Sequence, residues 1–235
     1  MGHKKLIRFE AIKSFPNVLQ YPKDMQGKWN NFLGNEHGIT LELACGKGEY
    51  TVALAQKYPN RNFIGIDLKG NRIWVGAKQC LDTGIKNAVF LRTQIEKITD
   101  YFSPSEVQEI WITFPDPQLR VSRAKKRLTH PRFLRLYRQI LAPGGFVHLK
   151  TDSPDLYQFT KLVCALFELP LWEDDDHVYA KEEISDELKI KTHYEGLDIA
   201  GSNRIHYLKF SLPHTLPLEK DEQLKQLLQE PRHEP

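Results

Sequence analysis

The chain has 235 residues, of which 40% are hydrophobic and 27% charged, and its formal net charge is +3 at pH 7. These values suit one globular domain with a sizeable core, while no apolar run is long enough for a membrane span and the N-terminus lacks the apolar stretch of a secretory signal. Cys45, Cys80 and Cys164 are widely spaced and form no Cys-x-x-Cys pair, which argues against a disulfide framework or a zinc site. We therefore expect a cytoplasmic protein that binds no metal.

From Ile39 onward, short apolar runs alternate with longer amphipathic ones. In chain order the pattern predicts a strand at 39–43, a helix at 48–58, a strand at 62–67, a helix at 71–82, strands at 88–91 and 109–114, a helix at 131–141, a strand at 146–150, a helix from 153 to about 167, and a strand at 205–212. This alternation predicts an α/β fold, a doubly wound, mostly parallel sheet with helices on both faces. Ligands in such folds bind at the carboxyl ends of the strands.

Composition divides the chain into three parts. Residues 1–35 form a basic extension, residues 36–213 carry the alternating pattern, and residues 214–235 are polar and are expected to form a loose tail. Within the central part, residues 168–187 are acidic, with Asp174-Asp175-Asp176 at their centre. We expect this acidic stretch to be a solvated loop.

A glycine turn follows the first predicted strand and opens the first helix, with the sequence Glu42-Leu43-Ala44-Cys45-Gly46-Lys47-Gly48-Glu49. Its two glycines let the backbone approach a ligand closely, although they also suit a turn with no ligand. A dinucleotide site would have a third glycine where Thr51 stands, and its pyrophosphate would face Glu42 and Glu49. A cationic ligand without phosphate, such as S-adenosylmethionine, fits better. Asp67, at the end of the second strand, is placed to accept ribose hydroxyls.

A second unusual stretch, FPDPQLRVSRAKKR at 114–127, follows the fourth predicted strand and places Asp116 between two prolines that restrict its loop. Residues 117–151 contain no Asp or Glu but nine Lys or Arg. Such asymmetry is typical of a nucleic-acid face, although a solvated helix gives the same pattern. We expect phosphate contacts from the loop at Arg123, Lys125, Lys126 and Arg127, an extension of the patch along Arg132, Arg135 and Arg138, and an N-terminal arm with Lys4, Lys5, Arg8 and Lys13.

Taken together, these motifs resemble the bacterial tRNA (guanine-N7)-methyltransferases, class I S-adenosylmethionine-dependent enzymes that modify a guanine in the tRNA variable loop. The resemblance covers about residues 40–212. It is carried by Leu41-Glu42-Leu43 with Gly46-x-Gly48, Gly65-Ile66-Asp67, Phe114-Pro115-Asp116-Pro117, Arg127-Leu128-Thr129, Lys150-Thr151-Asp152, Thr192-His193-Tyr194-Glu195 and Tyr207-Leu208-Lys209-Phe210. It implies a seven-stranded Rossmann-like sheet, with residues 36–213 as the methyltransferase domain.

The resemblance also implies roles for individual residues. The S-adenosylmethionine pocket would be lined by Glu42, Gly46, Gly48, Asp67, Gln94 and Asp116, with Asp116 as the catalytic residue. The substrate would be contacted by Arg120, Asp152, Thr192, His193, Tyr194 and Glu195. The chain departs from the family at Gln118-Leu119-Arg120-Val121, where Trp-Pro-Lys-Lys is usual, at Gln94, where an acid is usual, and at His193-Tyr194, where Lys-Phe is usual.

The expected chemistry explains why an acid stands in the loop. Guanine N7 carries a lone pair and no proton, so its methylation needs no general base. The product is a cationic purine, which the carboxylate of Asp116 can stabilise while it accepts hydrogen bonds from N1–H and the exocyclic amine. We expect tRNA as the partner and no membrane, and the sequence leaves a homodimer open. Two alternatives remain: a methyltransferase acting on another RNA, a protein or a small molecule, and an inactive RNA-binding protein that retains a cofactor pocket.

Overall fold

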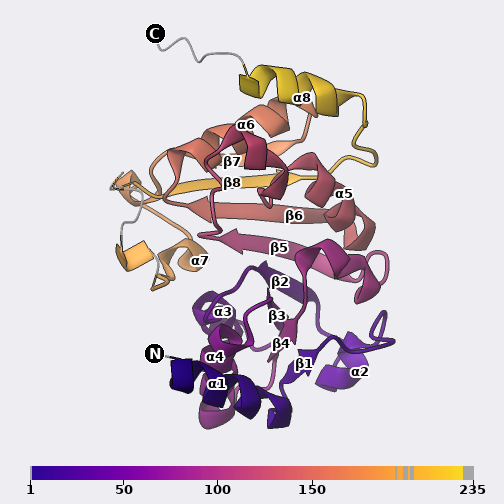
Figure 1. The fold of residues 1–235 in the computed structure, drawn as a ribbon, viewed down its shortest axis with the longest axis vertical. Coiled ribbons are helices and arrows are strands. Elements are labelled where there is room, and N and C mark those ends of the chain that lie inside the picture. Colours follow the sequence, from indigo (N-terminus) through magenta and orange to yellow (C-terminus); the bar gives the residue numbers. More distant parts are fainter. Residues whose placement is uncertain (1, 194, 198–200, 202–203, 230–235) are drawn as a thin grey trace.

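The computed structural model describes residues 2–193, 195–197, 201 and 204–229, and within them eight strands form one sheet in the order β1-β4-β3-β2-β5-β6-β8-β7 (Figure 1). The strands are β1 (Val18–Gln20), β2 (Ile39–Leu43), β3 (Asn62–Asp67), β4 (Ala88–Arg92), β5 (Val107–Thr113), β6 (Leu141–Thr151), β7 (Leu171–Asp175) and β8 (His206–Ser211). Strand β8 pairs antiparallel with β6 and β7, and the other pairings are parallel. The predicted doubly wound, mostly parallel sheet is therefore confirmed.

The connections between the strands are mostly helical. The α-helices are α1 (Gly2–Ala11), α2 (Trp29–Leu33), α3 (Glu49–Lys57), α4 (Gly70–Thr83), α5 (Pro131–Ile140), α6 (Pro154–Leu166), α7 (Asp186–Lys189) and α8 (Lys220–Gln229). Short 3-10 turns form η1 (Ile12–Ser14), η2 (Ile95–Asp100), η3 (Val121–Lys126), η4 (Val178–Ala180) and η5 (Glu195–Leu197). None of the described helices is both long and apolar enough to cross a bilayer.

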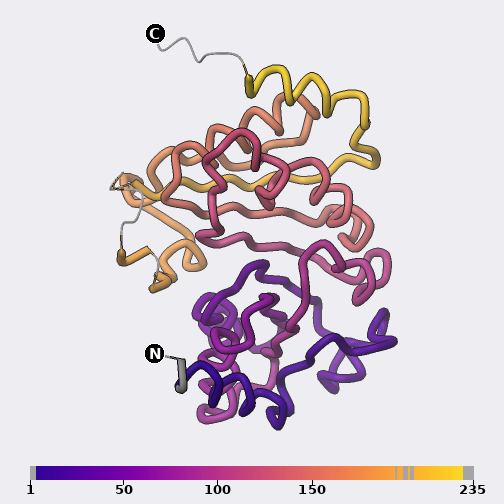
Figure 2. Tube along the Cα trace, in the orientation of Figure 1, coloured from indigo at the N-terminus to yellow at the C-terminus, as the bar shows by residue number. Residues whose placement is uncertain are grey.

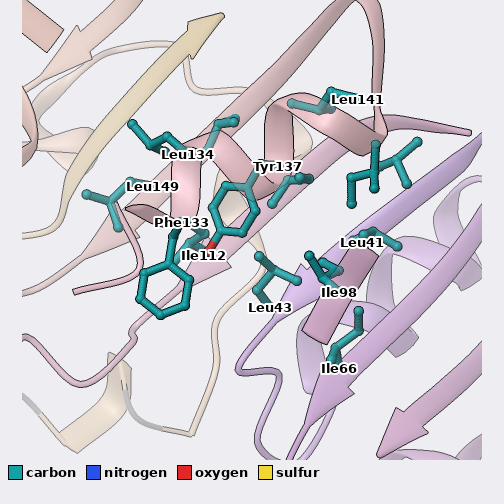
Figure 3. Close-up of a cluster of buried hydrophobic side chains, with 14 of the residues drawn as sticks. Leu41, Leu43, Ile66, Ile98, Ile112, Phe133, Leu134, Tyr137, Leu141 and Leu149 are labelled. Atoms are coloured by element: carbon teal, nitrogen blue, oxygen red, sulfur yellow. The ribbon is translucent and has the colours of Figure 1, made fainter. Parts of the chain in front are cut away.

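Two apolar cores cover the two faces of the sheet. On one face, Leu41 and Leu43 of β2 pack with Tyr137 of α5 in a cluster that Figure 3 shows in close-up. On the other face, Phe90 of β4 and Tyr50 of α3 belong to a second cluster. Because both faces are covered, the central strands are buried along their whole length, as expected for parallel strands.

The N-terminal extension contributes to the fold, and the sheet has one strand more than expected. Strand β1 lies in this extension and pairs with β4 at the edge of the sheet. Ile12 and Trp29 are fully buried, so the boundary expected at residue 35 does not separate two structural parts. Helix α1 lies along α4, with the Arg8 guanidinium 4.6 Å from the centre of the Trp74 ring. Figure 2 shows α1 and the C-terminal helix at opposite ends of the molecule.

The acidic stretch and the C-terminal segment also differ from expectation. The acidic stretch contains β7, an edge strand that pairs with β8, where a solvated loop was expected. Its charged side chains suit an edge, since they discourage pairing with another chain. The described part of the C-terminal segment, residues 214–229, is held rather than loose: Leu216 and Leu224 are buried, and Arg135 donates to the carbonyls of Leu216 and Pro217.

Candidate active site

A cavity of about 640 Å³ opens at the carboxyl ends of β2, β3, β5 and β6. The sequence-predicted residues Glu42, Gly46, Asp67, Asp116 and Asp152 line it, together with Thr192. These residues come from five separate stretches of the chain. The sheet topology brings the first five together, because the carboxyl ends of neighbouring parallel strands meet at one edge, while Thr192 comes from the segment between α7 and β8.

The glycine turn forms one wall of this cavity. Gly46 and Gly48 have φ values of +57° and +71°, in the region that favours glycine. A Cβ atom on Gly48 would also come within 2.4 Å of the Phe90 ring. Gly48 therefore supports the turn from behind, while Gly46 lines the cavity.

Asp67 ties this turn to the start of α4. Its Oδ2 accepts from the Gly46 N–H at 2.9 Å, and its Oδ1 accepts from the Lys69 N–H at 2.7 Å. Each carboxylate oxygen retains a second acceptor position. The side chain can therefore organise the turn and also accept hydrogen bonds from a ligand.

Glu42 is buried behind the turn and lies in a polar cage. Its Oε2 accepts from the Thr51 N–H at 2.8 Å and from the Thr51 hydroxyl, and its Oε1 accepts from the Thr113 hydroxyl at 2.7 Å. Burial raises the pKa of Glu42 to about 7, although the hydrogen bonds from Thr51 and Thr113 act in the opposite direction. A cation in the cavity would therefore meet a carboxyl group that titrates near neutral pH.

Asp116 stands on a strained loop at the end of β5. Phe114 and Gln118, which flank it, have φ values of +47° and +48°. Such values are uncommon outside glycine, and they persist only where surrounding contacts hold them. The Asp116 side chain is exposed, and its Oδ1 accepts from the Gln118 N–H at 3.0 Å. The loop thus presents a solvated carboxylate to the cavity.

Arg127 supplies part of what holds this loop, and it differs from the other expected phosphate contacts. It is only 3% exposed, and it donates to the carbonyl oxygens of Gln118 and Leu119 at 3.2–3.3 Å. Its guanidinium lies 4.4 Å from the centre of the Phe159 ring. The expectation that Arg127 contacts RNA phosphate does not fit this burial, because its donors face the loop of its own chain.

The remaining cations separate into two groups. Arg120, Arg123, Lys125 and Lys126 are exposed on and beside η3, next to the Asp116 loop. The phosphate-binding patch was also expected to extend along α5, but two of the three arginines there have partners in the C-terminal segment. Arg135 pairs with Asp221, and Arg138 donates to Pro213 and contacts His214, so both hold the C-terminal segment.

The residues expected at the substrate differ in their placement. Asp152 and Thr192 line the cavity. His193 is exposed, with its N–H donating to Glu49, while Tyr194 lies outside the described residues. The Glu195 carboxylate is turned inward and bonds to Lys150 and Tyr179.

The residues expected to bind the cofactor differ from the residues that line the cavity in two respects. Gln94 is exposed at the start of η2 and is not among the lining residues. Sequence reasoning missed Lys47, Lys69 and Arg72, which line the cavity beside the glycine turn. These residues were not predicted to line the cavity because lysine and arginine occur throughout the chain. Only their position just after the strand ends distinguishes them from other basic residues. The described residues contain no cluster of His, Cys, Asp and Glu suited to a metal.

Comparisons with known proteins identify the family of the chain. A family model described as a putative methyltransferase matches residues 36–206. The tRNA (guanine-N(7)-)-methyltransferase of Bacteroides thetaiotaomicron is 45% identical over 222 residues, which cover 91% of this chain and 87% of the relative. That of Porphyromonas gingivalis is 46% identical, with 86% of each chain covered.

A solved 16S rRNA methyltransferase, KamB, has a similar fold, with a TM-score of 0.61, 14% identity, and coverage of 84% of this chain and 99% of that one. At this identity the likeness concerns the fold alone. The family model and the curated relatives decide the family. The chain belongs to the tRNA (guanine-N(7)-)-methyltransferases.

Proposed function

We propose that the protein transfers a methyl group from S-adenosylmethionine to N7 of a guanine in tRNA, and that this guanine lies in the variable loop. The observation that carries the proposal is a single cavity in which a glycine turn, with two buried acids, meets the exposed carboxylate of Asp116. The names of the curated relatives support tRNA as the substrate and N7 as the methylated atom. The variable loop rests on the family resemblance.

The residues of the cavity fit this cofactor. S-adenosylmethionine, when bound, supplies a methyl group on a positively charged sulfur. Glu42 and Asp67 place negative charge beside the glycine turn, and the free acceptor positions of Asp67 suit ribose hydroxyls. Lys47, Lys69 and Arg72 complement the carboxylate of the amino-acid part.

Asp116 acts on the guanine rather than on the cofactor. N7 attacks the methyl carbon while the carbon–sulfur bond breaks and its electron pair remains on sulfur. No proton leaves N7, so the role of Asp116 is to hold the base in line and to stabilise the positive charge that develops on the purine. Its exposed carboxylate can also accept from guanine N1–H and the exocyclic amine, a donor pair that selects guanine.

The pKa of Glu42 predicts a pH dependence of cofactor binding. Because this pKa is about 7 in the free protein, a large fraction of Glu42 is protonated at pH 6. A cationic ligand favours the carboxylate and lowers the pKa in the complex, so binding releases a proton and strengthens as pH rises. We expect the Kd to be up to about tenfold higher at pH 6 than at pH 8.

Calorimetry in two buffers of different ionisation enthalpy counts the proton directly. Glu42→Gln is the matched control, because it keeps the size of the side chain and removes the titration. The control should bind with a flat pH profile. A wild-type profile that is equally flat would show that Glu42 does not change its protonation on binding.

The exposed cations near the Asp116 loop predict the salt dependence of tRNA binding. Replacing Lys125 and Lys126 together with Ala should reduce the slope of log K against log salt by about 1.5, since each phosphate contact contributes about 0.7–0.9. Cofactor affinity should not change. The matched control is Lys78→Ala with Lys86→Ala, because Lys78 lies on α4, where it pairs with Asp82, and Lys86 is exposed just before β4. Equal slopes for both double variants would assign Lys125 and Lys126 to a solvated face.

Methyl transfer with labelled cofactor separates the alternatives. The purified protein is incubated with bulk tRNA, with ribosomal RNA and with a protein extract, and the label in each fraction is counted. Label confined to tRNA supports the proposal. Label in another fraction indicates a different substrate, and binding of tRNA without any label indicates an inactive RNA-binding protein.

A further inference from the structure

Lys150 is a fully buried lysine that the chemistry above does not use. It is the penultimate residue of β6, and its side chain is 0% exposed. Its Nζ donates to the carbonyls of Leu188 and Ile190, both at 2.9 Å, and to Glu195 Oε2 at 3.0 Å. The Nζ also donates to the Tyr179 hydroxyl at 3.3 Å, and that hydroxyl donates to Glu195. The three protons of the ammonium group thus meet four acceptors, of which the two carbonyls and the carboxylate are the nearer.

This arrangement requires a charged pair. Burial lowers the pKa of Lys150, and Glu195 acts against that shift by stabilising the ammonium form. The Glu195 side chain is itself only 4% exposed. A buried charge without a partner is costly, so each member of the pair depends on the other.

Lys150 also joins three parts of the active-site cavity. Its carbonyl oxygen accepts from the N–H of Phe114, at the start of the Asp116 loop, at 2.8 Å. Two residues further along the chain, Asp152 lines the cavity. The Lys150 ammonium group holds the carbonyls of residues 188 and 190, which lead directly to Thr192, another lining residue of the cavity.

We propose that Lys150 is a positioning residue for methyl transfer, and that its ammonium group, with Glu195 as counterion, holds residues 188–193 so that Thr192 completes the cavity around the substrate. This inference rests on the proposed function for the identity of the substrate. It gives Glu195 an internal role in place of the substrate contact implied by the resemblance. Lys150 is not among the residues that line the cavity, so it would act through the segment that it holds.

The test compares two variants that separate positioning from stability. Lys150→Met removes the charge and leaves Glu195 unpaired, whereas Lys150→Met with Glu195→Gln leaves no buried charge. The double variant should therefore recover melting temperature relative to the single variant. It still lacks the donor for Leu188 and Ile190, so residues 188–193 should stay released. The matched control is Lys181→Met, which removes a half-exposed lysine paired with Asp175.

Three measurements are made on each full-length variant. Trypsin cleavage after Lys189 and Lys191 reports local opening of the segment, and we expect it to be at least about tenfold faster in both Lys150 variants. The single-turnover rate of methyl transfer to tRNA should fall by about a hundredfold, the effect of a small misplacement of reacting groups. Cofactor affinity should stay within about twofold of wild type, because the glycine turn and Asp67 are untouched.

Melting temperature, methyl transfer and trypsin resistance together distinguish a positioning role of Lys150 from a purely stabilising one. A double variant that recovers both melting temperature and methyl transfer would overturn the proposal and make Lys150 a purely stabilising residue. Wild-type trypsin resistance in the variants would overturn it as well. Should neither Lys150 variant fold, Tyr179→Phe, which removes one hydroxyl and no charge, must show the same two defects to a smaller degree, or the proposal fails. If the wild-type protein transfers no methyl group to tRNA, the proposed function fails, while the trypsin result still decides whether Lys150 holds the segment.

Discussion

Replacing Asp116 with Asn should lower the single-turnover rate of methyl transfer by about a hundredfold or more. The reason is electrostatic: the amide removes the charge that stabilises the cationic purine, and its NH₂ group confronts a guanine donor. The loop should survive, because the amide oxygen can still accept from the Gln118 N–H as Asp116 Oδ1 does. Cofactor and tRNA affinities should hold, since other residues of the cavity and the exposed cations supply them.

The measurement is a rapid-quench rate with saturating cofactor and tRNA, which isolates the chemical step. Asp155→Asn is the matched control, because it removes a carboxylate that lines the same cavity from the first turn of α6. The control should keep most of its rate. A near-wild-type rate for Asp116→Asn would show that Asp116 is only a turn residue, and that another acid, such as Asp152, holds the guanine.

Replacing Asp67 with Ala should weaken cofactor binding by at least about tenfold, with little change in tRNA affinity. Two effects add. The ribose hydroxyls lose their acceptor, and the N–H groups of Gly46 and Lys69 lose theirs, so the glycine turn is no longer held. Leaving such groups unpaired costs about 1–3 kcal/mol.

Calorimetry with the cofactor and with its demethylated product measures this loss. Asp82→Ala, which removes a surface acid paired with Lys78 on α4, is the control and should bind as the wild type does. The cofactor affinity of Asp67→Asn should lie between those of Asp67→Ala and Asp82→Ala, because the amide oxygen can still accept a hydrogen bond. Unchanged affinity in Asp67→Ala would remove Asp67 from the cofactor site.

The central sheet could be predicted because each of its strands is a local pattern. The strands at 39–43 and 62–67 were predicted with the bounds that the structure shows, since both are apolar runs closed by turn signals. Strand β1 is only three half-buried residues long and is not an apolar run closed by turn signals. Strand β7 lies in an acidic sequence that is typical of a solvated loop. Both are strands because a neighbour offers an unpaired edge, which local sequence does not reveal.

The part of the site that lies at strand ends could also be predicted from the sequence. Residues at strand ends, such as Asp67 and Asp116, have their position fixed by the topology, and the structure brings them into one cavity. The directions of long side chains depend on packing between distant segments. Arg127 and Glu195 therefore read as ligand contacts in sequence, yet both face inward in the structure. The sequence alone does not show whether a charged side chain points into the protein or toward a ligand.

Locating the transferred methyl group shows whether this cavity methylates guanine N7 in tRNA. A tRNA transcript is treated with the protein and labelled cofactor and then cleaved by aniline after borohydride reduction, which breaks the chain at 7-methylguanosine. We predict one cleavage site, at a guanine of the variable loop, that is absent when Asp116→Asn replaces the wild type under single-turnover conditions. Label on any other atom or nucleotide, or no label from a protein that binds both cofactor and tRNA, would show that the cavity does not methylate guanine N7 of the variable loop.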